Sequence, residues 1–192
     1  MKTAGTIGPY TVKLHDNGLA EAVDKGRVFA VANQAGVTSQ AGLSATTPVL
    51  TLVNPAGSGV TGRLWFAGAT FTVVFAAVAA VFVAVGTNTV AAAVTGTLTT
   101  AHRNLKLGSL NAQGNKITPM LAATLPAAPV AISLLGAGLT GAVNLLPQIQ
   151  VLGRWYNGAI NIEPGTNLSI QTGAASGASG TFCEYIWEEV DA

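Results

Sequence analysis

The chain has 192 residues and a mass of 19.3 kDa; 49% of its residues are hydrophobic, only 9% are charged, and the net charge is +1. An ordinary soluble domain carries about 25% charged residues, so this composition supports a packed core and excludes intrinsic disorder. The single cysteine excludes an internal disulfide framework and a cysteine-rich zinc site, and the balanced charge excludes the basic signature of a nucleic-acid-binding protein.

Strand-like runs recur along the chain, each bounded by Gly, Pro, Asn or Asp. They fall at residues 10–14, 27–33, 48–53, 63–66, 90–98, 129–135, 149–156, 159–163, 167–172 and 181–190. Many short strands separated by turns predict an all-β protein, a single jelly-roll-like β-sandwich with short helical or loop insertions. Residues 1–26 are predicted to form an N-terminal arm or first strand, and residues 27–192 the sandwich.

The stretch from Ala67 to Gly86 (residues 67–86) is uncharged and, at about 20 residues, meets the length rule for a membrane helix. Its Val, Phe and Thr residues favour strands instead, and Phe71, Val73 and Phe75 follow a period of two. No Lys/Arg cluster flanks it to set an orientation. We therefore expect two buried strands with a turn at residues 76–80, and a membrane helix stays the alternative.

Helical periodicity is confined to residues 112–125 and 139–146, which prolines interrupt. Asn157-Gly158 lies between two apolar runs and predicts a hairpin turn. In the last strand, alternation places Trp187 on the same face as Cys183 and Tyr185. The aromatic residues expected in the core are Trp65, Phe66, Phe71, Phe75, Trp155, Phe182 and Trp187.

The charges are unevenly distributed. No carboxylate occurs between Asp24 and Glu163, and four acidic residues gather at residues 184–191. Because interface cores are poor in charge, such a body predicts a surface that other chains cover, although a Thr/Ser/Asn/Gly-coated monomer is the alternative. The basic body and the acidic end would suit contact between neighbouring copies, with Arg103 and Lys106 as candidate partners for the acidic end or for phosphate.

No combination of residues predicts catalysis, a metal site or a cofactor site, so the chain is not expected to be an enzyme. Two G-x-G-x-x-G matches occur at residues 57–62 and 136–141, but a strand follows the first and Pro147 ends any helix after the second. His15 and His102 have no metal-spaced partner. Cys183 is expected to be a small core residue.

Glu188 and Glu189 would suit half of a cation site only if they shared a face. Alternation along the strand sends their side chains to opposite faces. A salt-bridged or solvated strand end is therefore the expectation for this pair.

The C-terminal string NGAINIEPGTNLSIQTGAASGASGTFCEYIWEEV, residues 157–190, combines a Pro-Gly turn, an L-S-I strand, a Gly/Ala loop and a closing W-E-E-V strand. NPAGSG at residues 54–59, VTGT at 94–97 and RNLKLGS at 103–109 extend the pattern. This combination resembles a group of small virion structural proteins of tailed bacteriophages. The resemblance covers residues 25–190 and rests on short structural motifs.

The resemblance implies a jelly-roll-like sandwich carried in many copies on a phage particle, as a head decoration or cement protein. Its implied partners are other copies of itself, with a trimer favoured, and the major capsid protein or another virion protein, but no nucleic acid. Residues 1–18 lack the apolar core of a signal peptide, so synthesis in the host cytoplasm is expected. A receptor- or glycan-binding fibre or tail domain is the alternative, and a membrane-inserted protein using residues 67–86 is a weaker one.

Overall fold

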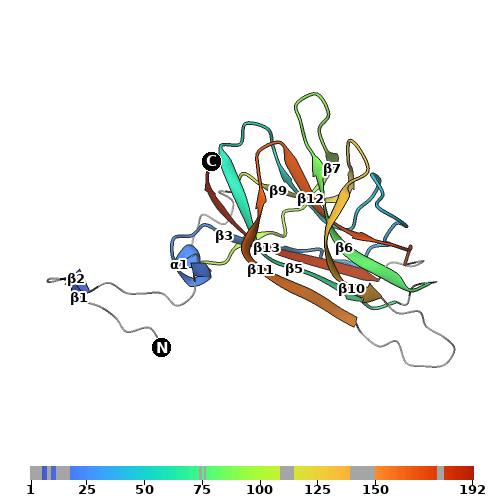
Figure 1. Cartoon of the computed structure of the whole chain (residues 1–192), viewed down its shortest axis with the longest axis horizontal. Helices are drawn as coiled ribbons and strands as arrows, with labels where there is room; N and C mark the ends of the chain where they lie inside the picture. The colour runs from blue at the N-terminus through green and yellow to red at the C-terminus, as the bar shows by residue number, and fades with distance from the viewer. Residues whose placement is uncertain are drawn as a thin grey trace.

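The computed structural model describes residues 6–7, 10–11, 18–73, 75, 77–108, 115–138, 150–176 and 180–192. These residues form two antiparallel sheets that pack face to face, an all-β sandwich as the sequence predicts (Figure 1). The six-stranded sheet has the order β10-β6-β12-β4-β9-β7, and the five-stranded sheet has the order β11-β5-β13-β3-β8. A separate pair joins β1 to β2.

The elements have the following bounds. They are β1 (Thr6–Ile7), β2 (Tyr10–Thr11), α1 (Gly18–Asp24), β3 (Val28–Ala32), β4 (Thr51–Asn54), β5 (Val60–Phe71), β6 (Ala79–Thr87), β7 (Thr95–Leu98), β8 (Arg103–Asn104), β9 (Thr118–Thr124), β10 (Val130–Gly138), β11 (Gln150–Ile162), β12 (Thr166–Thr172) and β13 (Thr181–Asp191).

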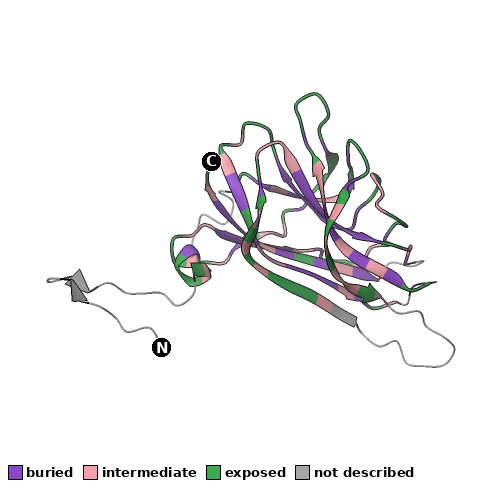
Figure 2. Cartoon of the chain, viewed as in Figure 1, coloured by how far each residue is buried: buried purple, intermediate pink, exposed green. Residues whose placement is uncertain are grey.

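The core lies between the two sheets, where alternate residues of the long strands meet (Figure 2). β13 contributes Cys183, Tyr185 and Trp187, all buried on one face as expected, and Trp187 stacks on Phe29 at 5.7 Å between ring centroids. A smaller cluster of Val53, Val94, Ala123 and Leu125 is separate from this core. Since Leu52 belongs to the main core and Val53 to the small cluster, strand β4 buries both of its faces.

The uncharged stretch at residues 67–86 forms strands, so the prediction of two strands is confirmed and the membrane-helix alternative is wrong for it. Its two strands, β5 and β6, lie in different sheets, and β6 already begins at Ala79, inside the expected turn at residues 76–80. In the described part of the chain, no helix has the length and apolarity needed to cross a bilayer.

Two local features differ from the sequence interpretation. The candidate helix at residues 112–125, which prolines already interrupt, contains strand β9, which pairs with β4 and β7; strand partners on both sides outweigh the helical propensity of its Ala and Leu residues. The Asn157-Gly158 pair does not reverse the chain. Both residues have positive φ, 52° and 77°, but the segments on either side of them pair with the same strand, β5. The pair therefore forms a bulge within β11. The second candidate helix, residues 139–146, lies outside the described residues.

Candidate functional site

The most distinctive surface of the molecule lies on strands β10 and β11. Among the described residues, eight large hydrophobic side chains are exposed, and half of them lie on these two strands. Trp155 of β11 is 54% exposed and Leu134 of β10 is also 54% exposed, with Val130 and Ile132 beside it. We call these four residues and the two strands that carry them the β10–β11 surface.

Both strands are sheet edges, and they lie on the same side of the sandwich. β10 ends the six-stranded sheet and β11 ends the five-stranded sheet. The Tyr156 hydroxyl donates a hydrogen bond to Ser133 Oγ at 2.8 Å, and Arg154 Nη1 lies 3.4 Å from the same oxygen. The Arg154 guanidinium also lies over the Tyr156 ring, 5.6 Å from its centroid. These contacts join the inner faces of the two edges. Leu134 pairs with Phe82 and Trp155 pairs with Phe66, so the exposed Leu134 and Trp155 side chains lie on opposite outer faces of the sandwich.

Trp155 is held on the outer face of the five-stranded sheet by Phe66, with ring centroids 5.0 Å apart. The two residues are paired across β11 and β5. The Phe66 ring can lie against the sheet because the neighbouring positions Gly68 and Gly153 have no side chain. A Cβ added at Gly153 would come within 2.6 Å of the Phe66 ring, and one at Gly68 within 2.8 Å. The glycines thus set the position of the aromatic pair.

The expectation that Trp155 belongs to the core is therefore wrong. Phe71, Phe75 and Trp187 are buried as predicted, whereas Trp65, Phe66 and Phe182 are only partly buried. The apolar and polar residues around Trp155 alternate as they do around a core residue. Trp155 nevertheless lies on an edge strand, and its side chain points to the outer face of the sheet. Sequence periodicity identifies the two faces of a strand and does not identify which strand is at an edge.

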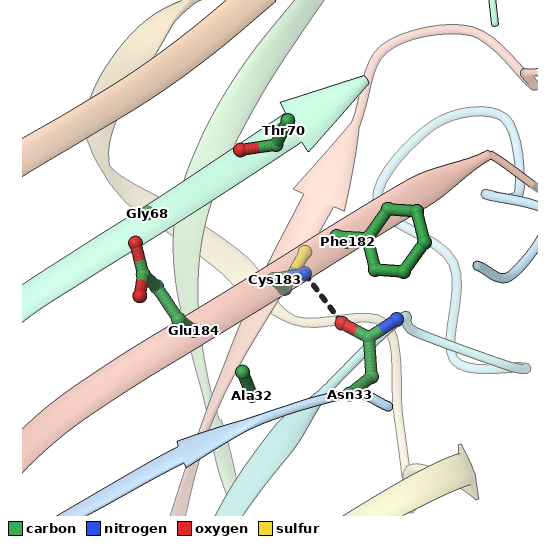
Figure 3. Close-up of a pocket in the computed structure, with 7 residues that line it drawn as sticks. All are labelled: Ala32, Asn33, Gly68, Thr70, Phe182, Cys183 and Glu184. Carbon is green, nitrogen blue, oxygen red and sulfur yellow. Dashed lines mark hydrogen bonds between the residues drawn. The ribbon is translucent and has the colours of Figure 1, made fainter. Parts of the chain in front are cut away.

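A shallow pocket lies on the outer face of the five-stranded sheet, with a volume of about 150 Å³ (Figure 3). Its walls are formed by Ala32, Asn33, Gly68, Thr70, Phe182, Cys183 and Glu184. Small-molecule sites usually measure about 300–1,000 Å³. The Asn33 amide is already engaged: its nitrogen donates to Ala35 O and Thr181 O, and its oxygen accepts from the Cys183 amide. The pocket offers little chemistry for a ligand.

The carboxylates of Glu188 and Glu189, at the acidic end of β13, have their ion-pair and hydrogen-bond partners within the chain. Glu188, which is buried, forms an ion pair with Arg27 at 2.6 Å, which confirms the salt-bridge prediction for this residue. Glu189 accepts hydrogen bonds from the amides of Lys116 and Ile117 and from the Trp187 indole. Both carboxylates are buried rather than solvated, so neither is a free partner for a neighbouring copy.

The side chains of the other candidate residues contact backbone carbonyl groups of the same chain. His102 Nδ1 lies 3.1 Å from Thr99 O, Arg103 donates to Thr100 O and His102 O, and Lys106 donates to Asp24 O. The first glycine motif, residues 57–62, ends inside β5, which begins at Val60.

The second glycine motif, His15 and Cys183 remain to be placed. Part of the second glycine motif, residues 139–141, lies outside the described residues, as does His15. Cys183 is buried as expected, and desolvation, with a smaller effect of Glu184, raises the pKa of its thiol strongly. Within the described ranges, no three His, Cys, Asp or Glu residues come together in a way that could hold a metal ion.

Comparison of the chain with protein-family models, curated proteins and solved structures finds no match. The class that the structure defines is the all-β sandwich, and its most distinctive feature is the set of exposed apolar side chains on its two edge strands.

Proposed function

We propose that this chain is a non-enzymatic structural protein of a virus particle, a decoration or cement protein on the head of a tailed bacteriophage. The observation that carries the proposal is the β10–β11 surface, where four apolar side chains are exposed on two edge strands of a body with very little charge. The phage-like motifs at the C-terminal end of the chain support it. They fall on β12, on β13 and in the turn between β11 and β12.

The mechanism is mechanical. Each copy buries apolar surface against its neighbours and against the shell, which is stabilising by at most about 25 cal/mol per Å² before association costs are subtracted. Many copies then act together, so contacts that are weak singly hold strongly on a particle. The partners in this proposal are further copies of the chain and the major capsid protein, and the location is the particle surface.

The test is to purify particles from a lysate of the source by density gradient and to label them with an antibody against this chain. We expect many copies in the particle band and gold label over the head in electron microscopy. Heads that lack the protein should break at lower temperature than heads to which it has been added back. A protein absent from the particle band would overturn the proposal.

The alternative of a glycan-binding fibre domain is favoured by one observation, the exposed ring of Trp155 on its Phe66 support. An exposed indole is a suitable platform for a sugar ring. This alternative predicts label at tail tips and binding on a glycan array that Trp155→Ala abolishes. Binding that is unchanged in that variant would exclude Trp155 as the platform.

A further inference from the structure

We propose that the outer face of the five-stranded sheet binds an arginine side chain of a partner protein through Phe66, Trp155 and Glu184. We call these three residues the aromatic–acidic site. It goes beyond the proposed function, because it defines the chemistry of one contact and does not depend on where the protein is located.

The three side chains share one face of the sheet. Trp155 of β11 is paired with Phe66 of β5, and Phe66 is paired with Ile186 of β13. Gly68, two residues after Phe66, is paired with Glu184, two residues before Ile186. Positions two apart in a strand point to the same face, and the register shifts of both pairings lie outside this segment. Glu184 therefore lies on the face that carries the two aromatic rings.

The carboxylate of Glu184 lies beside the Phe66 ring because Gly68 has no side chain. A Cβ added at Gly68 would come within 2.9 Å of Glu184 Oε1 and within 2.8 Å of Phe66 Cε1. Figure 3 shows the Glu184 side chain extending from β13 to β5 at Gly68. The faces of aromatic rings carry negative potential, as a carboxylate does. Ring faces and an anionic group are thus gathered at one place on the surface.

No cation of the described part of the chain neutralises this carboxylate. Glu184 is exposed, and among the described residues no group is hydrogen-bonded or ion-paired to its side-chain oxygens. Arg154 belongs to the opposite face, since it is paired next to the buried Ala67. Arg103 lies two strands away, about 10 Å across the sheet, and donates to backbone carbonyl groups. Arg63 lies about 16 Å along β5 from the glycine of the site. The carboxylate is therefore available to a cation of another molecule.

A guanidinium group complements this arrangement. The Phe66 and Trp155 rings have centroids 5.0 Å apart and planes inclined at 53°, so they form two sides of an open corner. Guanidinium is planar: it stacks on an aromatic ring and donates paired hydrogen bonds to a carboxylate, which the compact ammonium of lysine does not do. The shallow pocket beside Glu184 has a volume of about 150 Å³, which is room for one side chain and not for an extended ligand. An acidic peptide or a nucleic acid would instead be repelled by the carboxylate.

The test uses the full chain, isotope-labelled for nuclear magnetic resonance, and two probes of the same shape. N-acetyl-arginine amide carries the guanidinium, and N-acetyl-citrulline amide replaces it with a neutral urea. Each titration is followed at the indole N–H signal of Trp155, which is identified by its loss in Trp155→Phe. Glu184→Gln removes the charge of the site, and Asp191→Asn makes the same change at the end of β13. Both positions are exposed, so both variants should fold, which far-ultraviolet circular dichroism checks.

We expect the wild type and Asp191→Asn to bind the arginine probe equally, in the millimolar range, and to bind the citrulline probe roughly 5-fold more weakly. Glu184→Gln should raise the dissociation constant for the arginine probe roughly 5-fold and leave the constant for the citrulline probe unchanged, because only the charged probe uses the carboxylate. Equal binding of the two probes, an unchanged arginine constant in Glu184→Gln, or no shift of the Trp155 signal would overturn the inference.

A glycan platform at the same rings gives a different result. Methyl glycosides would then shift the Trp155 signal while N-acetyl-arginine amide would not, which would overturn this inference and favour the glycan-binding alternative. A chain that binds arginine through Glu184 but never appears on phage particles would support the aromatic–acidic site and refute only the virion role.

Discussion

Glu188 and Glu189 are adjacent carboxylates on β13 that serve different parts of the molecule. Glu188 neutralises Arg27, which lies just before β3, while Glu189 holds the backbone that leads into β9. Each side chain thus connects the central strand to a different segment. Strand alternation correctly separates the two faces, but only the structure shows that both groups are buried.

The ion pair gives the first prediction. Arg27→Met should lower the free energy of unfolding by about 2 kcal/mol, because it leaves the buried Glu188 carboxylate without its cation. Since Arg27 is partly exposed, this loss is smaller than the roughly 3–5 kcal/mol expected when a fully buried ion pair is broken. Arg27→Met combined with Glu188→Gln should lose less than the sum of the two single changes. Urea denaturation of all four proteins measures this, and strictly additive losses would contradict the coupling.

The second prediction concerns alkaline pH. Burial raises the pKa of the Cys183 thiol, and of the Tyr185 hydroxyl, above their ordinary values in the folded protein. As the pH rises, the unfolded chain therefore releases these protons before the folded protein does. The free energy of unfolding is at its full value below the ordinary thiol pKa of 9.0, and it falls as the pH rises through that value.

Between about pH 8 and pH 10 the protein should lose about 1–2 kcal/mol of unfolding free energy, measured by urea titration. Most of this pH dependence should disappear in Cys183→Ala, whatever that variant costs at neutral pH. The same slope in both proteins would show that other groups cause it.

At the scale of elements, the sequence identifies strands well and their pairing poorly. Residues 27–33, 48–53, 167–172 and 181–190 are predicted as strands and contain or overlap β3, β4, β12 and β13. Strand β9 was missed because its Ala and Leu residues favour a helix in isolation. Only the hydrogen bonds of β4 and β7 fix it as a strand.

The third prediction tests how tightly these elements are packed. A Cβ at Gly62 in β5 would come within 2.3 Å of Ile117 and 3.3 Å of Ile162, both buried in the core. Gly62→Ala should therefore lower the unfolding free energy by about 1–3 kcal/mol through overpacking.

Gly173→Ala is the matched control, because its added Cβ would meet only ordinary contacts at 3.4 Å and beyond. This variant should change stability by about 0.5 kcal/mol or less. Equal effects of the two substitutions in chemical denaturation would refute the packing argument.

At the scale of the whole molecule, the recurring strand-like runs and turns predict the all-β sandwich correctly. The candidate site could not be predicted in the same way. Trp155 is one of three tryptophans in similar strand-like surroundings, yet Trp187 is fully buried and Trp155 is exposed. The difference lies in the order of strands in the sheets, which depends on contacts between residues far apart in the chain.

The fourth prediction concerns the association between copies of the chain that the proposed function requires, through a body that is poor in charge. Association through apolar surface should be nearly insensitive to sodium chloride, which screens charges, and should strengthen in ammonium sulfate, which favours apolar burial. Sedimentation equilibrium in both salts measures the dissociation constant. A constant that rises steeply with sodium chloride would indicate an electrostatic contact instead.

The place of β13 has a consequence for how the chain folds. This strand lies between β5 and β3, although about 110 residues of chain separate it from β5 and still more from β3. Until residues 181–191 have been synthesised, both neighbours present open edges and the five-stranded sheet has no centre. Folding should therefore be slow, because distant segments must meet first, and the apolar strands of the unfinished chain stay exposed to aggregation until they do.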